Sequence, residues 1–265
     1  MTHTTAIIDA DLVLHRSAQS VQSEYQFPSG PAISADFPKA RERATDFILE
    51  YQRAVEADRV VLALSDPTGN YWRKQVLPSY KANRGSPKPV LFWNLREWME
   101  TEHECVWKPG LEGDDVCGIL LTNPNKYPGT RVCVSVDKDM MTVPGLHYRP
   151  HRRQDGIFEV TREQADRNHL MQTLTGDATD GFFGIKGVGP KKAEKILDAP
   201  PRPHTTHHSA CDCTPWAKVD RAYAKAGILP EDALVQARVA FILRHGWYHK
   251  DIGVKLWAPY EQENQ

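Results

Sequence analysis

The chain has 265 residues, of which 40% are apolar and 25% are charged, and its formal net charge is −1. It contains no apolar run of membrane-spanning length and no basic-then-apolar segment at its start, which argues against a membrane protein and against export. The five cysteines are an odd number scattered along the chain, so a reducing cytoplasm suits the protein better than a disulfide framework. The length allows one large domain, or one domain with a small satellite.

Apolar runs alternate with a segment of helical periodicity in the first half of the chain. Three runs predict strands that end in aspartate: 4–10 with Asp9, 59–66 with Asp66, and 131–139 with Asp137 and Asp139. Residues 39–57 carry apolar side chains at helical spacing. Strands that alternate with helices predict a mainly parallel α/β sheet, in which ligands bind at the carboxyl ends of the strands. The aspartates are therefore expected to meet at one edge, although an isolated strand-end aspartate is more often a turn residue or a helix cap.

Two polar segments follow the second predicted strand. In 77–84 (LPSYKANR), Tyr80 could stack on a nucleic acid, and Lys81 and Arg84 could supply cations; by itself the segment is also typical of a surface loop.

In 111–120 (LEGDDVCGIL), a helix would place Glu112 and Asp115 on one face and Asp114 on its flank. An acidic first turn that complements the helix dipole is the alternative interpretation.

The segment 175–197 (TGDATDGFFGIKGVGPKKAEKIL) combines acid with a glycine-rich turn. Asp177 and Asp180 are spaced i and i+3, directly before Gly187 and Gly189. Pro190 suits a first helical position, and outward backbone N–H groups at a helix N-terminus bind anions. Three lysines, Lys191, Lys192 and Lys195, add positive charge around a phosphate at this turn. The pattern has the form of a helix–hairpin–helix, with an ordinary tight turn as the alternative.

The segment 200–216 contains His204, His207, His208, Cys211 and Cys213. Zinc binding is one interpretation, but the spacing matches no standard finger, and a proline-rich loop with incidental thiols is favoured.

Five motifs, in this order, resemble the 5′-nuclease superfamily of flap endonucleases, polymerase I 5′→3′ exonuclease domains and free-standing phage exonucleases: IIDADLVLHRSA, ALSD…LPSYKANR, LEGDDVCGIL, SVDKDM and GDATDGFFGIKGVGPKKAEKIL. The resemblance covers roughly residues 5–198, and 222–243 is similar to the phage branch. It implies a PIN-like α/β fold with a mainly parallel central sheet flanked by helices. The implied divisions are a catalytic domain at 1–170, with a helical arch at about 82–110, and a helix–hairpin–helix DNA-binding region at 171–265.

The resemblance also implies roles for the matched residues. A first metal cluster would comprise Asp9, Asp66, Glu112, Asp114 and Asp115, completed by Asp137, Asp139, Asp177 and Asp180, which would hold a second ion. Arg16 and Lys81 would contact the scissile phosphate, and Tyr80 would stack on a terminal base. Gly187 and Gly189 would bind the downstream duplex backbone, at a turn that holds a potassium ion in relatives.

Two departures from the family pattern concern the metal site. Asp11 stands where the family usually has a small or neutral residue and could compete as a ligand, and Gly113 replaces the commoner alanine before Asp114. Within the expected arch, Phe92, Trp93 and Trp98 could stack on a 5′ single strand, although aromatic residues at this spacing more often pack in a core.

The chemistry of the residues agrees with these roles. Oxygen ligands without cysteine suit two Mg²⁺ or Mn²⁺ ions, and nine clustered carboxylates without cations would repel one another strongly. Without those nine acids the net charge of −1 would become +8, which suits DNA binding.

The sequence therefore predicts a monomeric, metal-dependent 5′→3′ nuclease of duplex DNA with 5′ ends, nicks or flaps, which could extend to RNA–DNA hybrids. It would work in phage DNA replication, primer removal or DNA degradation in the cytoplasm of a bacterial host. The alternative is a non-catalytic DNA-structure-binding protein that retains the fold.

Overall fold

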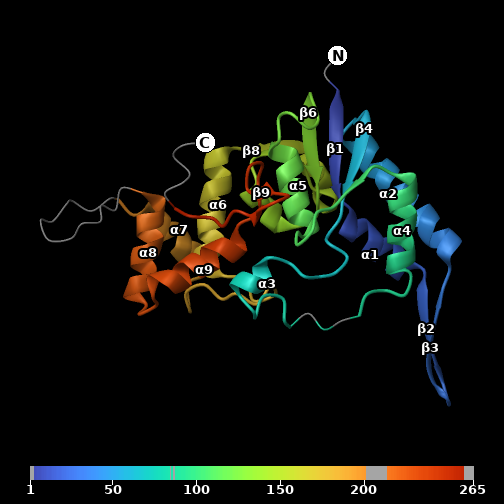
Figure 1. Ribbon diagram of the computed structural model, residues 1–265, viewed down its shortest axis with the longest axis horizontal. Coiled ribbons are helices and arrows are strands. Elements are labelled where there is room, and N and C mark those ends of the chain that lie inside the picture. Colours follow the sequence, from blue (N-terminus) through green and yellow to red (C-terminus); the bar gives the residue numbers. More distant parts are fainter. Residues whose placement is uncertain (1–2, 84, 86, 201–213, 260–265) are drawn as a thin grey trace, which may run out of the picture.

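The structure, a computed structural model, describes residues 3–83, 85, 87–200 and 214–259. These residues fold around a six-stranded central sheet with helices on both faces (Figure 1). No helix in the described part of the chain is long and apolar enough to cross a membrane. Arg84 and the histidine- and cysteine-containing segment 204–213 lie outside the described residues, so the predictions made for them stay predictions.

The central sheet is mainly parallel, which confirms the predicted fold class. Its strands are β1 (Thr4–Asp9), β4 (Arg59–Ala63), β5 (Cys105–Val106), β6 (Thr130–Val134), β7 (Gly145–Tyr148) and β8 (Ile157–Val160). They lie in the order β5–β4–β1–β6–β7–β8, and only β8 pairs antiparallel with its neighbour. The three strands predicted to end in aspartate, β4, β1 and β6, are therefore adjacent and point the same way.

Alternate side chains of the central strands fill a core on each face of the sheet. Ile7 of β1 belongs to one core, and Ala6 and Ile8 belong to the other. The helices that contribute to the core of Ala6 and Ile8 are α1 (Ala10–Ser20), α2 (Phe37–Ala54) and α4 (Phe92–Glu102). The opposite core contains α5 (Gly113–Thr122) and the C-terminal helices. Burial on both faces explains why these strands are continuous apolar runs in the sequence.

The segment predicted as an arch, about 82–110, contains the packed helix α4 (Phe92–Glu102) in this structure. Helix α4 begins at Phe92, and its side chains Phe92, Leu95 and Met99 are fully buried against α1 and α2. Phe92 therefore packs in a core and does not stack on a single strand. The side chain of Trp98 is half-buried, whereas that of Trp93 is 46% exposed. Among the three candidate stacking residues, only Trp93 presents a largely accessible ring.

A β-hairpin that no pattern in the sequence predicted projects from the molecule between α1 and α2 (Figure 1). It pairs β2 (Gln22–Phe27) with β3 (Gly30–Ala35) in antiparallel register. The side chain of Gln22 accepts a hydrogen bond from the backbone N–H of Val90, 2.9 Å away, so the base of the hairpin is tied to the loop before α4.

The C-terminal part consists of α6 (Arg162–Thr175), α7 (Pro190–Asp198), α8 (Pro215–Lys225), α9 (Pro230–Ala240) and a short hairpin of β9 (Tyr248–His249) and β10 (Gly253–Val254). The remaining short elements are α3 (Arg73–Val76), η1 (Lys138–Thr142) and η2 (Pro150–Asp155). Helix α6 begins with a capping box of Thr161 and Gln164. The predicted boundary between residues 170 and 171 lies inside α6, and one core joins residues on both sides of it, including Leu170 and Leu174.

Candidate active site

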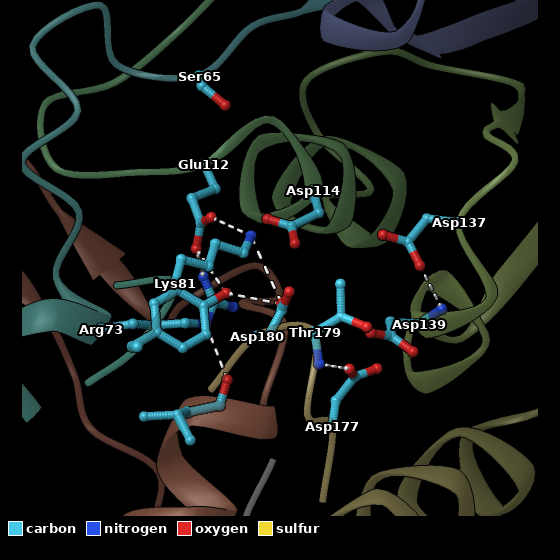
Figure 2. Close-up of polar contacts among 12 residues, drawn as sticks. Ser65, Arg73, Lys81, Glu112, Asp114, Asp137, Asp139, Asp177, Thr179 and Asp180 are labelled. Carbon is cyan, nitrogen blue, oxygen red and sulfur yellow. Dashed lines mark hydrogen bonds and ion pairs between the residues drawn. The ribbon is translucent and has the colours of Figure 1, made fainter. Parts of the chain in front are cut away.

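The carboxyl ends of the central strands bring acidic residues from distant segments to one edge of the sheet. Asp9 ends β1, and Asp66 and Asp137 follow the last residues of β4 and β6 by three positions. Figure 2 shows carboxylates from three parts of the chain around one space: Glu112, Asp114, Asp137, Asp139, Asp177 and Asp180. Of the acids that strand alternation predicted to converge, Glu112, Asp114 and Asp137 lie around this space, and Asp177 and Asp180 join them from a segment outside the predicted strands.

Lys81 lies between Glu112 and Asp180 (Figure 2). Its Nζ atom is 2.5 Å from Oε1 of Glu112 and 3.5 Å from Oδ2 of Asp180, and its backbone N–H donates to the carbonyl of Asp180 at 2.8 Å. Burial lowers the pKa of Lys81, but Glu112, Asp114 and Asp180 together outweigh it and raise the pKa to about 12. Lys81 has a φ of 53°, which is uncommon for a residue with a side chain. Lys81 is therefore a permanent cation, held between Glu112 and Asp180 by both its backbone and its side chain.

The structure corrects the stacking role predicted for Tyr80. Its side chain is only 2% exposed and packs with Phe182 and Val239. The hydroxyl lies 3.0 Å from Oε2 of Glu112 and 3.3 Å from Oδ2 of Asp180. A ring buried in this way cannot stack on a base, and Tyr80 instead contacts two carboxylates of the site through its hydroxyl.

Asp114 and Asp115 are neighbours in the first turn of α5 but have different surroundings. Asp114 is partly exposed toward the shared space, and its Oδ1 accepts only the backbone N–H of Asp115 among the described contacts. Burial, partly offset by Arg73, raises the pKa of Asp114 well above its usual range, with Asp115 and Glu112 adding repulsion. Asp115 is fully buried and bonds to Arg73 and Trp72.

The second group of carboxylates lies around η1 and the loop before α7. Asp137 accepts the N–H of Asp139 at 2.8 Å, and Lys138 Nζ lies 3.0 Å from Oδ2 of Asp177. Burial, and then repulsion from Asp137, raises the pKa of Asp139 to about 6. Burial opposes ionisation of Asp177, but the Lys138 ammonium and the hydrogen bonds from Thr179 together lower its pKa.

Asp9, at the end of β1, is linked to the second group of carboxylates through Ser135. Its Oδ2 accepts the hydroxyl of Ser135 at 3.1 Å, and the same hydroxyl oxygen accepts the N–H of Asp137. Burial raises the pKa of Asp9 to about 7, with repulsion from Asp11 as the next cause. Asp11 is thus close enough to affect Asp9, and its Oδ1 is a buried atom without a hydrogen-bond partner among the described residues.

Both carboxylate oxygens of Asp66 accept hydrogen bonds from nearby loop residues. Oδ1 accepts the N–H and the hydroxyl of Thr68 at 2.9 Å, and Oδ2 accepts the N–H of Gly110 at 2.6 Å. Burial opposes its ionisation, but the Gly110 and Thr68 donors lower its pKa. The interpretation of strand-end aspartates as turn residues therefore describes Asp66, and a metal role for it stays a prediction.

Arg16 is exposed on α1 and points toward α2. Its Nη1 lies 3.2 Å from the hydroxyl of Tyr51, and its guanidinium lies over the ring of Phe47. No contact of Arg16 with the carboxylates is present among the described residues, so its contact with a scissile phosphate stays a prediction.

The glycine-rich turn opens to solvent at the start of α7. Gly189 caps the helix and Pro190 occupies its first position, as the sequence predicts. Gly187 has a φ of 77°, and a side chain built at either glycine would meet nothing within 4 Å. Lys191 and Lys192 are exposed, and Lys192 Nζ donates to the carbonyl of Gly187 at 2.7 Å. The turn has the accessibility, the free helix N-terminus and the charge that a phosphate site needs.

The donor set fits divalent metal ions of the magnesium type. All the clustered acidic donors are oxygen atoms, and one carboxylate oxygen from each of Glu112, Asp114 and Asp115 lies within 4.8 Å of the other two. Three carboxyl groups, Asp9, Asp114 and Asp139, have raised pKa values because burial and neighbouring acids disfavour their charged forms. A bound cation relieves this repulsion, and hard oxygen donors suit Mg²⁺ and Mn²⁺.

Two residues beside the site gave no signal in the sequence. Arg73 and Trp72 contact Asp115, and Arg73 also contacts Glu112 and two carbonyl groups more than 160 positions along the chain. A tryptophan–arginine pair ahead of the LPSYKANR segment has no periodicity or motif spacing of its own. Only the tertiary contacts identify it.

Comparisons with known proteins agree with this geometry. Residues 4–166 match the family model described as "5′-3′ exonuclease, N-terminal resolvase-like domain". The chain is similar to the exonuclease of Escherichia phage T7, with 34% identity over 84% of this chain and 83% of that protein. It is also similar to the flap endonuclease Xni of Shewanella sp. (strain W3-18-1), with 28% identity over 61% of this chain and 65% of the relative.

Solved structures share the fold. One is the bacteriophage T5 flap endonuclease in a pseudo-enzyme–product complex with DNA and metal ions, with a TM-score of 0.55 and 16% identity over 90% of this chain and 93% of the other. Another phage T5 structure, co-crystallised with metal ions, has a TM-score of 0.58 and 14% identity over 90% and 89% of the two chains.

Proposed function

Because the chain belongs to the 5′-3′ exonuclease family, we propose that the carboxylate edge of its sheet is the centre of phosphodiester hydrolysis. The chain is a 5′→3′ exonuclease or flap endonuclease, as its relatives are. The observation that supports the site most strongly is the convergence of carboxylates from α5, η1 and the 177–180 loop around Lys81 (Figure 2).

Divalent metal ions are the cofactors that this site requires, and we propose two Mg²⁺ or Mn²⁺ ions. The residues that would hold them are Glu112, Asp114, Asp137, Asp139, Asp177 and Asp180, with Asp9 supporting the arrangement through Ser135. When bound, such ions supply an activated water and offset charge on the leaving oxygen. Asp66 and Asp11 are further candidates at the edge of this set.

The chain's own groups orient the reacting phosphate and neutralise its charge. Lys81 remains protonated at neutral pH, because its pKa is about 12, so it acts as a cation and not as a base. A cation fixed beside the carboxylates offsets the negative charge that develops on phosphate oxygens in the transition state. Arg16 would add a second cation if its side chain left Tyr51 and Phe47.

DNA is the substrate class, and the exposed turn before α7 is the proposed contact with the duplex. The backbone N–H groups at the start of α7, together with Lys191 and Lys192, would hold one phosphodiester backbone without reading bases. A potassium ion at Gly187–Gly189 is part of the same proposal. We further propose that the substrates are duplex DNA with 5′ ends, nicks or flaps, and RNA–DNA hybrids. We also propose that the protein is a monomer and works in the cytoplasm of a phage-infected bacterium.

A non-catalytic DNA-binding role would be favoured by loss of a site carboxylate or of Lys81. The chain retains all of them, and the described structure brings most of them together.

The test is Mg²⁺-dependent digestion of a blunt duplex and a matched 5′-flap substrate, both labelled at the 3′ end of the cut strand. Asp139→Ala should abolish cleavage and retain DNA binding, whereas Asp251→Ala, at an exposed position in the β9–β10 turn, should cleave like the parent protein. A descending ladder would identify an exonuclease, and one cut at the flap junction would identify a flap endonuclease. Full turnover by Asp139→Ala, or cleavage in EDTA, would refute the proposed site.

A further inference from the structure

Asp115 differs from the other carboxylates of the site because its hydrogen-bonding capacity is filled by protein groups. Oδ1 accepts Arg73 Nη2 at 2.8 Å and the backbone N–H of Leu243 at 3.0 Å. Oδ2 accepts Arg73 Nη1 at 2.7 Å and the indole N–H of Trp72 at 2.9 Å. A carboxylate offers about four lone-pair positions, so these four donors leave none for a metal ion. The side chain is also 0% exposed.

Arg73 is the partner that links Asp115 to the rest of the site. Its side chain is 1% exposed, and its Nη1 lies 2.7 Å from Glu112 Oε2 as well as from Asp115 Oδ2. Nε and Nη2 donate to the carbonyls of Val239 and Phe241, each at 2.9 Å. One guanidinium therefore fastens the end of α9 to the first turn of α5 and holds one oxygen of Glu112.

We propose that Asp115 binds no metal ion and that, with Arg73, it forms a latch that anchors residues 239–243 to α5 and fixes Glu112 for metal binding. This inference rests on the proposed function, because it assigns roles within that site. Glu112 keeps Oε1 directed to Lys81, on the side of the shared space, while the latch occupies Oε2. Arg73 and Asp115 are positioning residues, and Asp114, one position earlier and partly exposed to the shared space, is the ligand.

The electrostatics of the pair agree with a latch. Burial alone would lower the pKa of Arg73, but Asp115 is the largest of the causes that raise it well above its usual range. Removing one partner of a buried ion pair leaves the other charge buried without compensation, which is strongly destabilising. Removing a metal ligand from a crowded acidic site relieves repulsion instead. The two roles therefore predict opposite effects on stability.

The test compares Asp114→Asn with Asp115→Asn, using Mn²⁺ binding followed by electron paramagnetic resonance and thermal unfolding in EDTA. Asp114→Asn should weaken Mn²⁺ binding by roughly tenfold or more and leave Tm unchanged or higher. Asp115→Asn should bind Mn²⁺ within about threefold of the parent protein and lower Tm by roughly 10 °C. Loss of Mn²⁺ affinity in Asp115→Asn with an unchanged Tm would overturn the proposal. Failure of the parent protein to bind Mn²⁺ would instead refute the proposed function.

If Asp115→Asn does not fold, Trp72→Phe removes one donor to Asp115 and keeps both charges. The latch predicts a lower Tm and unchanged Mn²⁺ affinity, whereas tighter Mn²⁺ binding with an unchanged Tm would show that Asp115 is a ligand competing with Trp72.

Two substitutions of Arg73 separate positioning from folding. Arg73→Lys and Arg73→Met both lose the guanidinium contacts to the two carbonyls and should unfold at reduced temperatures, Arg73→Met at the lower one because it leaves Asp115 without a buried cation. Only lysine keeps a cation beside Glu112, so it should retain more Mn²⁺ affinity than methionine, measured at a temperature where both are folded. Equal and parent-like Mn²⁺ affinity in both variants would show that Arg73 does not position Glu112.

Discussion

Gly118→Ala is expected to destabilise the protein, although alanine is the better helix former. Gly118 lies inside α5, where a Cβ would stand 2.3 Å from the carbonyl oxygen of Leu243 and 3.1 Å from a methyl carbon of Ile242. Cβ atoms essentially never approach other atoms closer than 3.0 Å, so the backbone at Leu243 would have to move. That backbone is held by its hydrogen bond to Asp115, so it cannot move without loosening the latch.

The expected loss can be estimated from two opposing effects. Overpacking a well-filled contact costs up to about 3 kcal/mol. Replacing glycine by alanine within a helix stabilises the helix by about 1 kcal/mol. The net loss of about 2 kcal/mol corresponds to a fall in Tm of roughly 4–8 °C for a protein of this size.

Gly113→Ala in the same helix is the matched control. A Cβ there meets Asp11 Oδ2 at 3.5 Å and backbone atoms of Ala63 and Ser65 at 3.6 Å, which are ordinary contacts. Its stability should be unchanged or slightly higher. Thermal and urea unfolding followed by circular dichroism in EDTA would compare both variants with the parent protein. If Gly118→Ala were as stable as Gly113→Ala, the close packing of α5 against residues 242–243 would be refuted.

Three other predictions concern the site and its surroundings. Asp9 has a pKa raised to about 7 in the folded chain from an ordinary 3.8, so its contribution to stability is full below pH 3.8 and is lost as the pH rises through 7. Asp9→Asn should therefore stabilise the protein in EDTA at pH 8, by on the order of 4 kcal/mol, but not at pH 4; an equal gain at both pH values would contradict the assignment. Phe92→Ala should lower the free energy of unfolding by about 3–5 kcal/mol because the ring is fully buried, whereas Trp93→Ala should lower it by less than about 1 kcal/mol. The reverse order would show that Phe92 is exposed, as a stacking residue of an arch would be. Gly189→Asp should weaken duplex binding about tenfold in fluorescence anisotropy at unchanged Tm, since the position is open and only charge repulsion acts; unchanged affinity would remove the turn from the DNA contact.

Local patterns in the sequence determined the strands and the edge at which the acids meet. Apolar runs that alternate with helical segments predict parallel strands, whose carboxyl ends lie at one edge of the sheet, and β4, β1 and β6 are indeed adjacent and parallel. The start of α7 at Pro190 was equally readable, because a glycine cap followed by proline is a local steric signal. The order of the five motifs predicted the 5′-nuclease family and the nuclease activity.

The tertiary structure decided which of these acids are available to metal ions. Asp114 and Asp115 have the same chemistry and adjacent positions, and helical spacing cannot separate their roles. Asp115 is saturated by Arg73, Trp72 and the N–H of Leu243, and all three are distant in the chain. Periodicity shows which residues share a face of a helix, but the groups that meet that face come from long-range packing.

The same reason explains why the structure corrects the stacking role predicted for Tyr80, and why Phe92 packs in a core, as its spacing favoured. Tyr80 and Phe92 are aromatic residues in polar segments, which the sequence alone allows to be exposed stacking groups. Each ring is buried by helices from other parts of the chain, α9 for Tyr80 and α1 and α2 for Phe92. The free energy gained by burying an aromatic ring is realised only when those partners are in place, and no local pattern records them.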